Sequence, residues 1–315
     1  HLEDFACSLE DFRTGNNLQY DLIHSHYWLS GWVGRRIQRW WVVPHVIMFH
    51  TLGAVKNAIG VGENEPAMRI MAERELVKDC QRITAATDRG KEELVSCYGA
   101  APEKISVIPC GVNLELFRHT DKEVARHSLG LNGHKILLFV GRIDPLKGID
   151  RLLTAIPRLN TKQNLKLLVI GGDEDSQPEV ERLQKLCRSL NIQDSVTFTG
   201  IVEQTELPLY YSAADICIMP SYCESFGLVA LESLACGTPI VATNVGCIES
   251  VINHGRNGNM VEDNAPPRLA DGIDTLLAEG TESADSIRAS VSRSSWTSVA
   301  EAIIPEYRAV LEEYH

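Results

Sequence analysis

Residues 224–243 read ESFGLVALESLACGTPIVAT, a pattern that predicts a loop, then a helix, then a strand. The helix is predicted over residues 228–235, because this segment has the apolar density of a buried helix and Gly237 is the glycine expected just past its end. Residues 239–243 form a β-branched run, which is typical of a parallel strand covered on both faces. The stretch therefore predicts an α/β protein built around a parallel sheet.

Two glutamates occupy different positions in this stretch. Glu224 falls in the loop, whereas Glu232 falls inside the helix, about 6 Å along the axis from Leu228 at 1.5 Å per residue. Phe226, Gly227 and Leu228 open the helix, so their backbone amides have no acceptor within it and can bind an anion. Alternatively, Glu224 is a favourable charge near a helix start and Glu232 is an ordinary surface residue. A carboxylate on so apolar a helix nevertheless needs a polar partner.

A second motif follows a continuous apolar strand predicted over residues 135–140. It reads GRIDPLKG from Gly141 to Gly148, and helical spacing resumes over residues 149–159. Arg142 and Lys147 therefore project from the carboxyl end of a strand, where open α/β sheets bind ligands. An arginine fork and a compact lysine charge together suit a diphosphate, although isolated basic residues in a loop are usually solvated side chains.

Taken together, the two motifs resemble the donor site of the family 4 retaining glycosyltransferases, whose GT-B fold has two Rossmann-like domains facing a central cleft. The resemblance continues through residues 107–113 and Phe117, which are similar to the family's interdomain segment, and it covers nearly the whole chain. It implies that Arg142 and Lys147 bind the donor phosphates, that Glu232 binds the ribose and that Glu224 faces the donor sugar. The expected donor site also includes Gly141, Phe226, Gly227 and Leu228.

The amino-terminal motifs resemble one branch of this family, the N-acetylglucosaminyltransferases that act on inositol phosphate in mycothiol synthesis, and more distantly the bacterial sucrose-phosphate synthases. By the family resemblance, His50 lies near the donor sugar and joins Arg142, Lys147 and Glu224 in the catalytic set. By the branch resemblance, Tyr27, Thr51 and Arg69 hold an acceptor phosphate. From the residues alone, a histidine at the end of an apolar strand, as His50 is, is more often a structural cap, and Tyr27 is equally a core residue with a satisfied hydroxyl.

The connection pattern divides the chain into two series of strands and helices. The first series has short strands at 46–49, 82–85 and 105–108, and a polar segment over 118–134 separates it from the second. We expect a partial acceptor-side domain over 1–118, to which helix 298–315 crosses back by resemblance, and a donor-binding domain over 119–297. Because the chain begins at His1 and lacks the family's glycine-rich loop, we expect the first domain to be incomplete, with an exposed sheet edge.

Composition excludes several classes of partner. The net charge of −12 argues against nucleic acid and anionic membranes, and no apolar run of about 18 residues predicts a membrane span. Nine cysteines without a Cys-x-x-Cys pair indicate reduced thiols and a cytoplasmic location. No histidine-rich or paired-aspartate cluster predicts a metal site, so we expect metal-independent chemistry with no cofactor beyond the donor.

The leading prediction is transfer of glucose or N-acetylglucosamine from a nucleotide-diphospho-sugar, with UDP as the first candidate, to a polyol phosphate or sugar phosphate. Retention is expected through attack on the face that the diphosphate leaves, rather than through a covalent glycosyl-enzyme. Two alternatives stay open: a nucleotide-sugar binding fragment without turnover, and a nucleotide-sugar epimerase, which the paired glutamates disfavour. The sequence does not indicate an oligomeric state.

Overall fold

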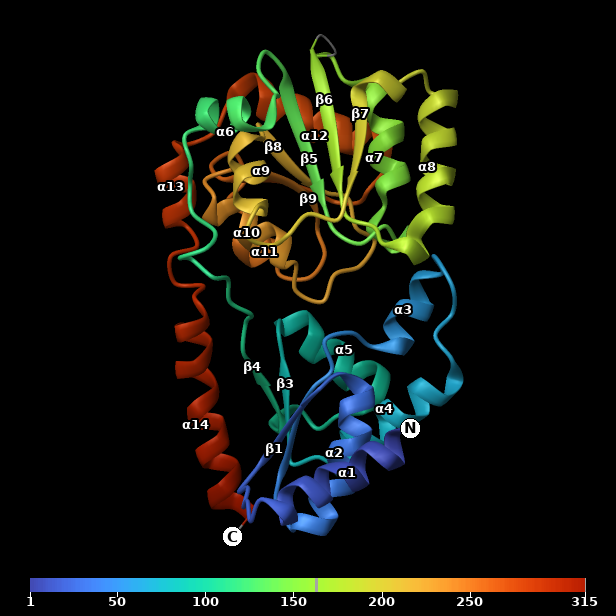
Figure 1. The fold of residues 1–315 in the computed structure, drawn as a ribbon, viewed down its shortest axis with the longest axis vertical. Coiled ribbons are helices and arrows are strands. Elements are labelled where there is room, and N and C mark those ends of the chain that lie inside the picture. Colours follow the sequence, from blue (N-terminus) through green and yellow to red (C-terminus); the bar gives the residue numbers. More distant parts are fainter. Residues whose placement is uncertain (162–163, 315) are drawn as a thin grey trace. The chain divides into compact units, whose positions relative to one another are not determined.

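A computed structural model describes residues 1–161 and 164–314 (Figure 1). The chain forms two compact units, His1–Cys110 with Thr297–His315 (unit 1) and Gly111–Trp296 (unit 2). Each unit contains one parallel sheet accompanied by helices, which confirms the predicted α/β class. Within the described residues, no helix combines the length and the apolar character that crossing a membrane requires.

Unit 1 is built on a four-stranded parallel sheet in the order β1-β2-β3-β4. Its strands are β1 (Ile23–His26), β2 (His45–Met48), β3 (Arg82–Ala85) and β4 (Ile105–Val107). Its helices are α1 (Leu2–Gly15), α2 (Tyr27–Trp41), α3 (Gly53–Ile59), α4 (Ala67–Asp79), α5 (Asp88–Tyr98) and most of α14 (Trp296–Tyr314). The core includes Ile47, Leu76 and Ile83, which are buried between the sheet and the helices.

Helix α14 is held to unit 1 by polar contacts with three strands. Tyr307 Oη lies 2.6 Å from His24 Nδ1, Ser106 Oγ donates to Glu306 at 2.5 Å, and Arg82 donates to Glu313 at 3.0 Å. Segments almost three hundred residues apart in the sequence therefore belong to one unit.

Unit 2 contains a six-stranded parallel sheet in the order β10-β9-β8-β5-β6-β7. Its strands are β5 (Lys135–Val140), β6 (Leu165–Ile170), β7 (Val196–Gly200), β8 (Ile216–Met219), β9 (Ile240–Thr243) and β10 (Gly258–Val261). Its helices are α6 (Lys122–Leu129), α7 (Ile149–Ala155), α8 (Gln177–Ser189), α9 (Leu207–Ala213), α10 (Leu228–Ala235), α11 (Ile248–Val251), α12 (Pro266–Glu279) and α13 (Ala284–Ala289). Helix α10 has the predicted bounds.

The structure differs from the sequence-based expectations in several places. Helix α7 ends at Ala155, short of the expected residue 159, because Pro157 stands in a 3-10 turn, and two further elements were not expected at all. The segment expected to be a polar separator contains α6, because the Asp121 side chain accepts hydrogen bonds from the amides of Glu123 and Val124 and caps a helix whose Ala125 is buried. Strand β10 was not predicted, because its sequence Gly-Asn-Met-Val has little β-branched character and it forms by pairing with β9.

Candidate active site

The candidate site lies where the strand order of unit 2 reverses. From β5 the chain proceeds to β6 and β7 on one side, and it then returns to place β8, β9 and β10 on the other side. The loops that follow β5 and β8 diverge at such a point and leave a crevice at the carboxyl ends of the strands. These loops are the two motifs singled out in the sequence.

A main-chain hydrogen bond joins the two loops, in which the Tyr222 amide donates to the Leu146 carbonyl at 2.8 Å. The side chain of Asn264, which follows β10, donates to the Pro220 carbonyl at 3.0 Å and fixes the second loop. Gly148 has φ +65°, and a Cβ atom there would lie 2.2 Å from the Pro220 oxygen. The close approach of the loops therefore requires glycine at this position.

Lys147 and Glu224, one from each motif, form an ion pair. Lys147 Nζ lies 2.5 Å from Glu224 Oε1, and the Ser221 hydroxyl donates to the same oxygen at 2.9 Å. Both side chains are mostly buried, at 19% and 15% exposure. The fold thus brings together two predicted site residues from separate motifs. The Glu224 carboxylate neutralises the positive charge of Lys147.

Arg142 extends from the end of β5 into solvent, with 74% of its side chain exposed. Its guanidinium lies 3.5 Å from Asp144, whose other carboxylate oxygen accepts a hydrogen bond from the Leu146 amide. An exposed ion pair of this length is weak and is readily exchanged for a bound anion.

Helix α10 begins at Leu228, four residues after Glu224 of the Lys147–Glu224 ion pair. Gly227 precedes its first residue with φ +102°, and the Phe226 carbonyl accepts a hydrogen bond from the Cys247 amide at 2.8 Å. Thr243 Oγ1 donates to the Ser221 carbonyl at 2.6 Å. The loop that follows β9 therefore fixes the segment carrying Glu224 and the helix start, whose first amides have no acceptor within the helix.

Glu232 lies one turn along α10 and has the polar partner that the sequence required. The hydroxyl of the fully buried Tyr211, on α9, donates to Glu232 Oε2 at 2.8 Å. Burial raises the pKa of Glu232 to about 6, although the Tyr211 hydrogen bond acts in the opposite direction.

An apolar cavity of about 270 Å³ opens at the carboxyl ends of β5, β6 and β7, with Arg142 in its lining. Its walls include Gly172, in the loop that follows β6, and Ile201, Val202 and Leu207, from the end of β7 to the start of α9. No sequence motif marks the residues of that second connection as site residues. Gly171 lets these loops approach, since a Cβ atom there would lie 1.8 Å from the Gly141 oxygen.

Unit 1 brings together the three predicted acceptor residues. Arg69 Nη2 donates to the Thr51 carbonyl at 3.0 Å and to Thr51 Oγ1 at 2.8 Å, and its guanidinium carbon lies 5.0 Å from the centre of the Tyr27 ring. The Arg69 side chain is 2% exposed and also contacts Glu73 at 2.8 Å and Glu65 at 2.9 Å.

His50 directly precedes Thr51, at the carboxyl end of β2, with φ +60°. Its Nε2 lies 2.8 Å from His26 Nδ1, and partial desolvation lowers the pKa of both rings, so the pair is neutral near pH 7. His26 was not predicted as a site residue, although its place at the end of β1 parallels that of His50 at the end of β2.

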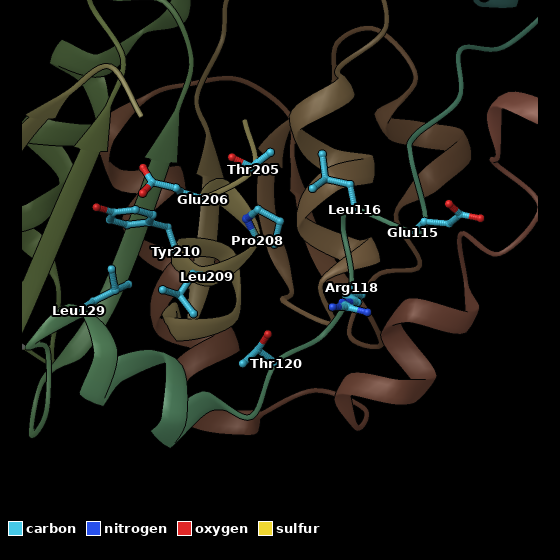
Figure 2. A pocket seen from close by; sticks show the side chains of 10 residues that line it. All are labelled: Glu115, Leu116, Arg118, Thr120, Leu129, Thr205, Glu206, Pro208, Leu209 and Tyr210. Carbon is cyan, nitrogen blue, oxygen red and sulfur yellow. The ribbon is translucent and has the colours of Figure 1, made fainter. Parts of the chain in front are cut away.

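A larger cavity of about 430 Å³ in unit 2 contains none of the predicted site residues (Figure 2). Figure 2 shows that side chains from residues 115–120, from the end of α6 and from residues 205–210 at the start of α9 surround it. Its size alone does not make it the site, because the predicted charged residues Lys147 and Glu224 meet elsewhere, where the strand order of unit 2 reverses between β5 and β8.

Comparison with known proteins identifies the family. Residues 121–292 match the model for glycosyl transferases group 1, and residues 5–116 match the model for glycosyltransferase family 4. The chain is 42% identical to D-inositol 3-phosphate glycosyltransferase 2 of Catenulispora acidiphila, over 93% of this chain and 72% of that protein. It is 41% identical to the D-inositol 3-phosphate glycosyltransferase of Acidothermus cellulolyticus, over 93% of this chain and 68% of that protein.

Among solved structures, the sucrose-phosphate synthase of Thermosynechococcus elongatus superimposes with a TM-score of 0.89 at 31% identity, covering 99% of this chain and 78% of that one. This structural match extends over both compact units. The family 4 model covers most of unit 1, and the group 1 model covers most of unit 2. The chain therefore belongs to the family 4, group 1 glycosyltransferases of GT-B fold, and it is a transferase enzyme.

Proposed function

We propose that this glycosyltransferase moves glucose or N-acetylglucosamine from a UDP-sugar to a polyol phosphate or sugar phosphate, with retention of configuration. The observation that carries the proposal is the meeting of Lys147 and Glu224 beside Arg142 and the start of α10. The relatives' names refer to inositol 3-phosphate and to sucrose phosphate, which supports a phosphorylated acceptor.

The donor diphosphate binds to Arg142, Lys147 and the first amides of α10 in this proposal. Negative charge grows on the leaving diphosphate as the glycosidic bond breaks, so cations already in place stabilise the transition state more than the ground state. The nucleobase enters the apolar cavity beside Arg142, and the ribose hydroxyls donate to Glu232.

Glu224 binds hydroxyl groups of the donor sugar and does not attack its anomeric carbon. Its Oε1 already accepts hydrogen bonds from Lys147 and Ser221, which reduces its nucleophilicity. The acceptor hydroxyl instead attacks on the face that the diphosphate leaves, and a departing phosphate oxygen takes its proton. His50 contacts the same sugar, while Tyr27, Thr51 and Arg69 hold the acceptor phosphate.

Transfer requires no divalent metal in this proposal, because Arg142, Lys147 and the helix amides supply the positive potential at the diphosphate. Full activity is expected in excess EDTA. Loss of activity that magnesium or manganese restores would contradict this point.

We also propose a cytoplasmic location. Cys80, Cys187, Cys217, Cys236 and Cys247 are buried, as is typical of cysteines in proteins that fold in a reducing compartment.

The test incubates the protein with UDP-glucose or UDP-N-acetylglucosamine, with and without inositol phosphate or fructose 6-phosphate. NMR of the product is expected to show an acceptor-dependent glycoside that keeps the donor's anomeric configuration. UDP binding without turnover would instead indicate a binding fragment, and a converted donor sugar would indicate an epimerase. An inverted product, or a sugar adduct on Glu224 detected by intact mass, would overturn the mechanism.

A further inference from the structure

One carboxylate in unit 1 occupies a position suited to a bound phosphate. Glu65 accepts a hydrogen bond from Lys56 Nζ, and its other oxygen lies 2.9 Å from Arg69 Nη1. Glu65 is 16% exposed, and although partial burial favours its neutral form, the hydrogen bonds from Lys56 and Arg69 lower its pKa overall. The group is therefore an oxyanion held between an ammonium and a guanidinium, which is also how proteins hold phosphate.

The Arg69 guanidinium also contacts Thr51 and Tyr27, the other residues that we propose to hold the acceptor phosphate. Arg69 Nη2 donates to Thr51, and the Tyr27 ring lies under the guanidinium. Glu65 consequently shares its cation with the residues that we propose to hold the acceptor phosphate. The charges of Lys56, Arg69, Glu65 and Glu73 cancel, so an incoming phosphate gains little attraction while Glu65 remains in place.

Glu73, the other carboxylate on Arg69, has a different setting. It is fully buried and accepts hydrogen bonds from Arg69 Nε at 2.8 Å, from the Gly53 amide at 3.0 Å and from the Tyr98 hydroxyl. These contacts join α3, α4 and α5, so Glu73 anchors Arg69 and cannot leave without disturbing the core.

Glu65, in contrast, can withdraw its side chain without moving its backbone. Its amide donates to Asn57 Oδ1 at 2.7 Å and its carbonyl accepts from Asn57 Nδ2 at 3.1 Å, which ties the main chain to α3. The Glu65 side chain is partly exposed, and residues 62–64 and 66–68, which flank it in the sequence, are exposed. A rotation about the side-chain bonds is enough to bring it into water.

We propose that Glu65 occupies the acceptor phosphate's place in the unliganded enzyme, and that the acceptor phosphate displaces it and binds Lys56 and Arg69. This inference rests on the proposed function and adds Lys56 as a phosphate ligand. It makes Glu65 a specificity-determining residue: a phosphate dianion, with more charge and more acceptor oxygens than a carboxylate, competes successfully, whereas a neutral polyol does not.

The test compares Glu65→Gln with Glu63→Gln, which removes the same charge from an exposed position on the same loop. Glu65→Gln is expected to lower the KM for the phosphorylated acceptor and the inhibition constant of inorganic phosphate by about five- to tenfold, the range expected for losing a competing ion pair. Glu63→Gln is expected to change both by less than about twofold. The donor KM stays unchanged in both variants.

A raised or unchanged acceptor KM in Glu65→Gln would overturn the inference, because Glu65 would then support the site or be irrelevant to it. Lys56→Met provides a second test if the first variant is unstable on thermal melting. It is expected to raise the acceptor KM by about tenfold without affecting the donor KM, whereas a lysine that only balances Glu65 would leave the acceptor KM unchanged.

Failure of the inference is distinguishable from failure of the proposed function. If the wild type transfers sugar to phosphorylated acceptors and Glu65→Gln does not bind them more tightly, the inference is wrong and the function stands. If the wild type transfers to no phosphorylated acceptor, the function fails, and inorganic phosphate alone then tests the site by its effect on the melting temperature. Equal shifts in wild type and Glu65→Gln would overturn the inference in that case.

Discussion

At the scale of single residues, a substitution of Lys147 should affect sugar transfer and leave nucleoside binding unchanged. Lys147→Met removes a preorganised cation from the diphosphate and is expected to lower kcat/KM by on the order of a hundredfold. Uridine binding should change little, because the nucleoside lacks the phosphates. Lys135→Met is the matched control, since Lys135 is an exposed lysine at the amino end of β5, the strand that precedes the loop carrying Lys147. Equal losses in both variants, or weakened uridine binding, would exclude the assigned role.

Glu232 makes nucleoside binding depend on pH. Its pKa of about 6 means that the carboxylate becomes protonated as pH falls from 7 to 5, and the ribose then loses its charged acceptor. Uridine affinity, measured by calorimetry, should therefore be flat above pH 7 and fall by about tenfold near pH 5. Tyr211→Phe removes the hydrogen bond that favours the carboxylate, so the midpoint should move to higher pH. In Glu232→Gln the pH dependence should disappear, and its persistence there would assign the effect to another group.

At the scale of elements, the contact between the two loops depends on a glycine. In Gly148→Ala, the added Cβ atom meets the Pro220 oxygen in a left-handed conformation, which is expected to cost about 2 to 4 kcal/mol of unfolding free energy and to displace the loop carrying Glu224. Gly130→Ala is the control, with φ +68° and open space around the new atom, and it should cost only about 1 kcal/mol. Denaturant unfolding measures both. Equal costs would show that the contact with Pro220 does not strain the loop.

At the scale of the whole molecule, the two units should respond to acid in opposite directions. Burial lowers the pKa of His24 and His45 in unit 1 to about 4, so the unfolded chain binds more protons between pH 6.5 and 4 and unit 1 loses stability as pH falls. For His45 alone this amounts to about 3 kcal/mol. In unit 2 the raised pKa of Glu232 has the opposite sign, since the folded state takes up its proton first and gains stability between pH 6 and 4.5.

Calorimetry at pH 7 and pH 5 tests this difference. At pH 5 the unfolding transition of unit 1 should move to lower temperature, whereas that of unit 2, which the shift caused by Gly148→Ala identifies, should move to higher temperature. The opposite order, or a single transition that shifts as a whole, would contradict the assignment of these pKa shifts to separately unfolding units.

Much of the fold was predictable from local patterns. Helix α10 and strands β3 and β5 have their predicted bounds, since apolar density, capping residues and glycines act within a few neighbours. The predictions failed at β10, where pairing with another strand decides the outcome, and at α6, where a polar sequence concealed a local capping signal. Strand β10 forms on the edge of β9, and α6 forms where Asp121 caps a largely charged segment.

The sequence by itself determined the family and the residues that carry its motifs, because Arg142, Lys147, Glu224 and Glu232 stand in two contiguous stretches with their own local structure. Only the tertiary structure decided which side chains meet: Lys147 with Glu224, Glu232 with Tyr211, and Glu65 with Arg69 and Lys56. The reason is physical. Local propensity acts along the chain, whereas ion pairing, desolvation and the shape of a cavity depend on distances in space, which the strand order of each sheet sets.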